Sequence, residues 1–175
     1  MANAVVMGPV PRLRYVLVTD HLLESLDQDE LEAVVAHELG HAKQHHVLVK
    51  LGALLLLAVA VGVGVALGSP LLRSVNPTVL VLVLPVLLVL ALLLVQGGLG
   101  LVLERRADEY AAGLVGVDPT VRGLERVAEA NLLKRRTGLL WNLLTHHPGV
   151  AQRVERLRAR QPHQRPTPPA PTATA

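Results

Sequence analysis

Two long uncharged stretches dominate the pattern of hydrophobic and polar positions along the chain. Residues 51–72 and residues 74–103 contain no charged side chain. A helix over the first stretch would be about 33 Å long at about 1.5 Å per residue, enough to cross the hydrocarbon core of a bilayer. Because the link near residues 69–77 is short, the pattern predicts a transmembrane helical hairpin over residues 47–103. Two buried core helices are the alternative, but a chain of 175 residues has too little other material to cover both.

The segment before the hairpin, residues 1–46, changes from a β pattern to a helical one. A strand is predicted over residues 15–19, with residues 4–7 as its partner and residues 8–11 as the turn. A helix is predicted over residues 27–46, because Asp27 and Glu30 form a capping-box pattern ahead of apolar residues at helical spacing. The first twelve residues lack the basic start of a signal peptide.

The segment after the hairpin, residues 104–160, is charged and helical in pattern. Helices are predicted over residues 104–114, 119–134 and 151–160, and residues 96–98 (Gln-Gly-Gly) are predicted as a kink or the point of exit from the membrane. Residues 161–175 are rich in Pro, Thr and Ala and are predicted to form a disordered tail. The expected organisation is therefore two halves of one domain separated by an inserted hairpin.

Composition narrows the chemistry. The chain has no Cys, which excludes disulfides and Cys-ligated metals, so a metal would need His and carboxylate ligands. The formal charge of +3 is mild, and no basic patch with interleaved aromatics indicates nucleic acid. Lys43, Lys50, Arg105 and Arg106 flank the hairpin, whereas Arg73 is the one basic residue in its link. The positive-inside rule therefore predicts both termini and the catalytic side in the cytoplasm of a multi-pass cell-membrane protein.

His37-Glu38-Leu39-Gly40-His41 is an H-E-x-x-H motif on the predicted helix. Residues four apart face the same side of a helix, so both imidazoles can reach one ion. Glu38 lies beside them, where a carboxylate can take the proton of an attacking water activated by zinc. Many helices carry this motif by chance, but here it leads directly to a membrane span.

A catalytic zinc usually needs a third protein ligand, and Glu104 is the leading candidate. It stands where the second uncharged stretch ends, on the same side of the hairpin as His37 and His41. Asp108 follows one helical turn later, where it can orient a ligand imidazole by a hydrogen bond. The competing interpretation of residues 104–108 is a solvated interfacial face with charge pairs.

The remaining histidines are less informative. His45 and His46 are either further ligands or, as we expect, polar residues at a helix end, and His21 is expected at the surface. His147 precedes the last predicted helix, where it either stabilises the oxyanion of a tetrahedral intermediate or has a capping role.

Taken together, these motifs resemble the HtpX and CAAX prenyl protease family of integral-membrane zinc metallopeptidases. The resemblance rests on HELGH, the hairpin and the E-x-x-A-D pattern of Glu104 to Asp108. Asn3-Ala4 with Gly8 matches the family's N-A-x-x-x-G motif, residues 18–41 match its strand and zinc helix, and residues 145–157 are close to its T-H-P-x-x-x-x-R-I-x-x-L segment. Family members usually carry a long stretch before the N-A motif, whereas Met1 lies two residues before Asn3 here.

The resemblance implies a role for each matching residue. His37, His41 and Glu104 would bind one zinc ion per chain, Glu38 would be the general base, and Asp108 would support a ligand. His147, the best match to the His of the T-H-P segment beside His146, would assist at the transition state. An extended substrate would pair with the strand that precedes the zinc helix, which here is Tyr15, Val16, Leu17, Val18 and Thr19.

The sequence therefore predicts a mainly α protein. It would have a zincin-like helical metallopeptidase domain, a short N-terminal β region and an inserted transmembrane hairpin. The expected function is a membrane-embedded zinc metalloendopeptidase whose partners are the bilayer and a protein or peptide substrate, such as a membrane or misfolded protein. A non-catalytic or regulatory membrane protein on the same scaffold is the alternative.

Overall fold

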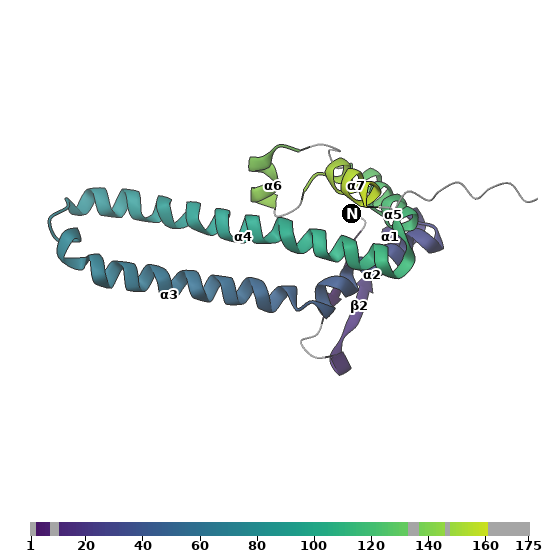
Figure 1. Ribbon diagram of the computed structural model, residues 1–175, viewed down its shortest axis with the longest axis horizontal. Helices are drawn as coiled ribbons and strands as arrows, with labels where there is room; N and C mark the ends of the chain where they lie inside the picture. Colours follow the sequence, from purple (N-terminus) through teal and green to yellow (C-terminus); the bar gives the residue numbers. More distant parts are fainter. Residues whose placement is uncertain (1–2, 8–10, 133–136, 146–147, 161–175) are drawn as a thin grey trace, which may run out of the picture.

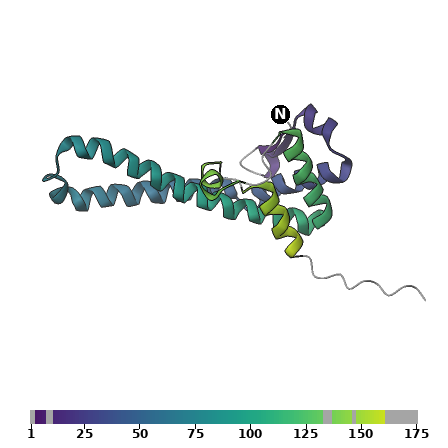
Figure 2. The same cartoon turned by 90° about the horizontal axis from the view of Figure 1, so that it is seen from above.

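The computed structural model describes residues 3–7, 11–132, 137–145 and 148–160. Figure 1 shows a long hairpin of two helices, α3 and α4, which projects from a compact helical body, and the orthogonal view agrees (Figure 2). These described residues are mainly helical and include one small sheet, as the sequence predicts. The predicted tail, residues 161–175, lies outside the described residues.

The sheet has two antiparallel strands, β1 (Ala4–Met7) and β2 (Tyr15–Val18), separated by a short 3-10 helix, η1 (Pro11–Leu13). Ala4 pairs with Val18 and Met7 with Tyr15, which confirms the predicted strand pair. Thr19 lies just beyond β2, where its backbone N–H donates to the carbonyl of Asn3 at 3.0 Å. The predicted turn falls mostly on residues 8–10, outside the described part of the chain.

A short helix that the sequence analysis did not predict, α1 (Asp20–Ser25), follows β2. Its Leu22 is fully buried and packs with Ala4 of β1, and Val34 from the next helix is part of the same cluster. This cluster attaches the sheet to the helical body.

Helix α2 (Gln28–Lys43) begins with the predicted capping box. The Glu30 backbone N–H donates to Asp27 Oδ1 at 2.8 Å, and the Asp27 N–H donates to Glu30 Oε2 at 3.1 Å. The prediction that this helix continues to residue 46 is wrong, because α2 ends at Lys43. His45 has a φ of 55°, a left-handed conformation that breaks the helix and redirects the chain.

The hairpin consists of α3 (His46–Leu72) and α4 (Pro77–Val115). Both are long and apolar enough to cross a membrane, and their most apolar windows are not buried in the protein. Gln96 of α4 donates to the Lys50 carbonyl of α3 at 3.2 Å. Helix α4 is continuous through residues 96–98, where a kink or the exit from the membrane is predicted, and it continues past Glu104 into the helical body.

The part of the chain that the structure describes after α4 contains three further helices, namely α5 (Val117–Ala130), α6 (Leu139–Thr145) and α7 (Val150–Ala159). Helices α5 and α7 correspond to predicted helices, whereas α6 was not predicted. The two halves of the body meet where α2 packs on α4. Small residues make this approach possible, since a Cβ on Gly40 would lie 3.2 Å from the Cα of Ala107 and 3.2 Å from the Cβ of Tyr110.

We predict that Gly40→Leu lowers the stability of the protein by about 1–3 kcal/mol, because the added side chain forces α2 away from α4. Gly113→Leu on α4 is the matched control, since nothing lies within 4 Å of a Cβ at that position. Thermal unfolding of both variants in detergent would measure the difference. Equal midpoints for the two variants would show that the contact is not close.

Candidate metal centre

Three side chains that the sequence analysis nominated as ligands converge at the contact between α2 and α4. His37 and His41 lie one helical turn apart on α2, and their Nε2 atoms are 3.2 Å apart. Glu104 reaches them from α4, with Oε1 3.3 Å from His41 Nε2 and Oε2 3.6 Å from His37 Nε2. One ligand atom from each residue can be chosen so that all three lie within 4.8 Å of one another.

These distances fit a divalent ion with nitrogen and oxygen ligands. Bonds of about 2.0–2.2 Å in tetrahedral geometry place neighbouring ligand atoms about 3.3–3.6 Å apart. Two imidazoles and one carboxylate are also the donor set of a well-known class of catalytic zinc site, which leaves a fourth position open for water or substrate. The residues present therefore fit a divalent metal such as zinc, which His37, His41 and Glu104 would hold.

Asp108 lies one turn beyond Glu104 and supports the first ligand. Its Oδ1 is 3.1 Å from His37 Nδ1, the ring nitrogen that faces away from His41. An imidazole that binds a metal through Nε2 carries its proton on Nδ1, so His37 would donate this hydrogen bond to Asp108. The interaction fixes both the orientation and the tautomer of His37.

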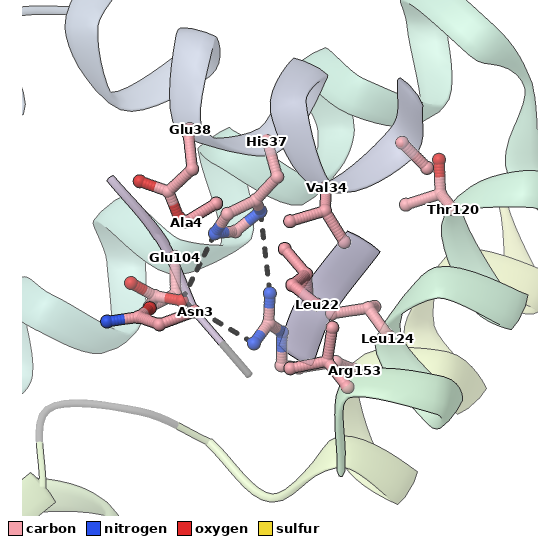
Figure 3. Close-up of a pocket in the computed structure, with 12 residues that line it drawn as sticks. Asn3, Ala4, Leu22, Val34, His37, Glu38, Glu104, Thr120, Leu124 and Arg153 are labelled. Carbon is pink, nitrogen blue, oxygen red and sulfur yellow. Dashed lines mark hydrogen bonds and ion pairs between the residues drawn. The ribbon is translucent and has the colours of Figure 1, made fainter. Parts of the chain in front are cut away.

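Arg153 is a buried part of this cluster that the sequence analysis did not assign. Its Nε donates to Asp108 Oδ2 at 2.9 Å, and its Nη1 lies 3.6 Å from Glu104 Oε2. Figure 3 shows the guanidinium beside both His37 and Glu104, with a dashed line to each. The only sequence signal was the Arg of the T-H-P-x-x-x-x-R pattern, which placed a cation on α7 without indicating its partners.

The carboxylates also control the charge of His37. Burial is the largest single effect on its pKa and lowers it, but the hydrogen bonds with Asp108 and Glu104 together raise the pKa to about 9. Without a metal, a proton on His37 therefore balances part of the negative charge at neutral pH. A bound cation would take the place of that proton.

His46 supports the second ligand from the opposite side. It is buried at the start of α3, and its Nδ1 lies 2.8 Å from His41 Nδ1. If His41 binds metal through Nε2, its Nδ1 carries the proton and His46 accepts the hydrogen bond. His46 stands at a helix end, as expected, but it is buried against His41, whereas its neighbour His45 is exposed.

Glu38 lies at the open side of the cluster. It lines two cavities, each shared with His37 and Glu104. In Figure 3 the carboxylates of Glu38 and Glu104 lie on the same side of the His37 ring. This position suits a group that exchanges protons with a reactant held at the centre.

The larger cavity, of about 560 Å³, lies between β1, Arg14, α2 and the start of α3. Val5 and Val6 of β1 line it, and Asn3 and Ala4 line the smaller cavity behind the centre. None of the residues 15–19 lines either cavity. The structure thus brings β1, and not the expected substrate strand, next to Glu38, because β1 lies between β2 and α2. His147 lies outside the described residues.

Comparison with known proteins identifies the family of the chain. The sequence model of peptidase family M48 matches residues 1–161. A "Protease HtpX homolog" of Dictyoglomus thermophilum is 31% identical over 183 residues, which cover 89% of this chain and 59% of the relative. Proteins of the same name from Thermococcus sibiricus and Helicobacter pylori are each 30% identical, over 89% and 83% of this chain.

The chain spans about three fifths of the length of the first two of these relatives. No solved structure matches it at a significant level. The match to the family model covers both histidines of the H-E-x-x-H motif, Glu104, Asp108 and Arg153. The chain therefore belongs to peptidase family M48 and, within that family, is similar to the HtpX proteases.

Proposed function

We propose that this chain carries the catalytic centre of a membrane-embedded zinc metalloendopeptidase of zincin-like type, which hydrolyses peptide bonds in membrane or misfolded proteins. The observation that carries the proposal is the convergence of His37, His41 and Glu104 with Glu38 beside them. The family model and the names of the relatives support peptide hydrolysis as the reaction.

Each residue of the centre has a separate task in this proposal. Zinc, when bound, makes a water more acidic and polarises the substrate carbonyl. Glu38 accepts the proton of the attacking water and passes it to the nitrogen of the departing amine. His147 stabilises the oxyanion of the tetrahedral intermediate, as the resemblance of residues 145–157 implies.

Asp108, Arg153 and His46 keep the ligands in place. Asp108 accepts from His37, and Arg153 holds Asp108 so that the carboxylate cannot rotate away. His46 does the same for His41 from the start of α3. Such outer partners make the ligands more basic and hold their rings in one orientation.

The geometry favours β1 as the strand that pairs with an extended substrate. The backbone N–H of Thr19 donates to the carbonyl of Asn3, so these two residues form a hydrogen-bonded pair. In an antiparallel pair of strands, residues whose backbone groups bond to the partner strand alternate with residues whose backbone groups point away from it. The backbone groups of Ala4 and Val6 therefore point away from β2. A substrate strand added at this edge would run along the cavity that contains Glu38.

The hairpin would anchor this centre to the cell membrane. The apolar surfaces of α3 and α4 are largely exposed in the described structure, and the hydrocarbon core of a bilayer would surround them. The basic residues at the outer ends of the hairpin favour a cytoplasmic catalytic side and cytoplasmic termini. Glu104 directly follows the uncharged run of residues 74–103, so the centre would lie close to the membrane surface.

We predict that Glu38→Gln lowers kcat for unfolded casein by about 10²–10⁴-fold, because the amide cannot accept the proton of the attacking water. Bound zinc, measured by mass spectrometry on the detergent-purified protein, should be unchanged. Glu32→Gln on the exposed side of the same helix is the control and should keep wild-type activity. Equal cleavage by the Glu38 variant and wild type would rule out this role, and a wild type without activity would favour the non-catalytic alternative.

We predict that His46→Ala weakens zinc binding by about 10–100-fold, because His41 loses the partner that fixes its ring. His46→Asn should restore most of the affinity, since an amide oxygen can accept from His41 Nδ1. Competition with a chelator would give the affinities. His45→Asn is the control, because Asn tolerates the left-handed conformation at that position. The same affinity for wild type and His46→Ala would contradict the assignment.

A further inference from the structure

Helix α6 presents an apolar face that the rest of the described chain does not cover. Leu139 and Leu140 are each 71% exposed, Trp141 is 59% exposed and Leu144 is 45% exposed. Single exposed leucines are common on protein surfaces, but four large apolar side chains on one short helix form a patch that requires an explanation.

The polar contacts of α6 explain why this face points outward. Asn142, the buried residue of the helix, donates through Nδ2 to Gln152 Oε1 of α7 at 3.0 Å and accepts from the Thr137 hydroxyl. These bonds fix the rotation of α6 about its own axis. The apolar face is therefore a fixed feature of the fold.

Helix α6 lies beside the hairpin, displaced from the helical body towards the apolar spans, and both views show it there (Figures 1 and 2). Leu143 packs on Gly97 of α4 so closely that a Cβ on Gly97 would lie 2.4 Å from the Leu143 carbonyl oxygen. Gly97 precedes Glu104 by about 10 Å along the helix axis, at about 1.5 Å per residue.

The charged residues of the hairpin end near Gly97, the position at which α6 packs on α4. Gln96, next to Gly97, bonds to the carbonyl of Lys50, the last charged residue of α3 before its uncharged run. Beyond this level towards the hairpin tip, neither helix carries a charge until Arg73 in the link. The apolar face of α6 thus lies where the polar part of the hairpin gives way to its lipid-facing part.

We propose that α6 is an interfacial helix that inserts its apolar face into the lipid bilayer and so sets the height of the metal centre above the membrane. This proposal rests on insertion of the hairpin but not on peptidase activity. Lipid is the occupant that fits best, because α6 packs on α4 at Gly97, close in the chain to the exposed apolar residues Leu94 and Val95. A tryptophan on this face suits the interface between water and lipid, where tryptophan is enriched.

The anchoring has a mechanical consequence for the centre. A hairpin alone leaves the body free to tilt about the point where the helices leave the bilayer. A second contact through α6 restricts this tilt, and α6 is joined to α7, which carries Arg153, through Asn142 and Gln152. The face of α6 therefore fixes how the centre is presented to substrates near the membrane.

Trp141 makes the proposal directly testable, because it is the only tryptophan in the chain. The full chain would be reconstituted in vesicles of phosphatidylcholine and phosphatidylglycerol with lipids brominated either near the headgroup or near the chain end. We expect Trp141 emission to be quenched by the lipid brominated near the headgroup, less by the other lipid, and little by aqueous iodide.

Two variants calibrate the measurement. Trp141→Phe combined with Leu114→Trp puts the probe at an equally exposed position, 59%, on the cytoplasmic end of α4, and iodide should quench it. Trp141→Phe combined with Leu56→Trp puts it on the apolar surface of α3, where lipid quenchers should act. A Leu56→Trp probe that resists lipid quenchers would overturn hairpin insertion and this proposal with it.

The remaining outcomes separate the other occupants. Quenching of Trp141 by iodide alone, with the Leu56→Trp probe in lipid, would show that α6 faces water and would overturn the proposal. Protection of Trp141 from both quenchers would also overturn it and would indicate a protein cover. A protection that is lost when the protein is diluted in excess lipid would identify that cover as a second copy of the chain.

Discussion

The contact between α2 and α4 determines where every ligand of the candidate centre lies. The two helices are far apart in the sequence, and the hairpin between them returns the chain to the level it left. Gly40 allows the close approach, and the Gln44 side chain donates to the carbonyl of Arg106 at 3.1 Å, which fixes the end of α2 on α4. Because of this contact, His37 and His41, which lie one helical turn apart on α2, both come close to Glu104 of α4. Without it, the H-E-x-x-H motif would be two histidines on a helix.

Several charged side chains are buried around this contact, although the hydrophobic core that surrounds them is small. Glu104, Asp108 and Arg153 are all buried, and taking such groups out of water costs free energy that their mutual attraction only partly offsets. Their arrangement suits metal binding better than stability. Arg153 holds Asp108, Asp108 holds His37, and the carboxylates raise the pKa of His37 to about 9. On the other side of the centre, His46 links the second ligand to the first residue of the hairpin.

The features that could be predicted from the sequence are those that depend on the spacing of residues close together in the chain. The capping box at Asp27, the motif itself and the two apolar helices follow from residues close together in the chain, and Glu104 followed because a short link returns α4 to its starting side. The break at His45 was missed, since a left-handed non-glycine residue leaves no pattern. Arg153 was missed because it lies 116 positions from His37, and only packing brings them together. The sequence also did not show that β1, and not β2, lies beside α2, since the pattern of two short strands does not reveal which one faces a helix.

The most direct test of this account is the zinc content of Glu104→Ala, compared with Glu109→Ala on the same helix. Glu109 makes surface ion pairs with Arg105 and Arg160 and does not reach the centre. Purified wild type and Glu109→Ala should each hold about one zinc ion per chain after dialysis against a weak chelator, whereas Glu104→Ala should lose it. Full retention of zinc by Glu104→Ala would contradict the claim that the hairpin brings the third ligand back to the motif.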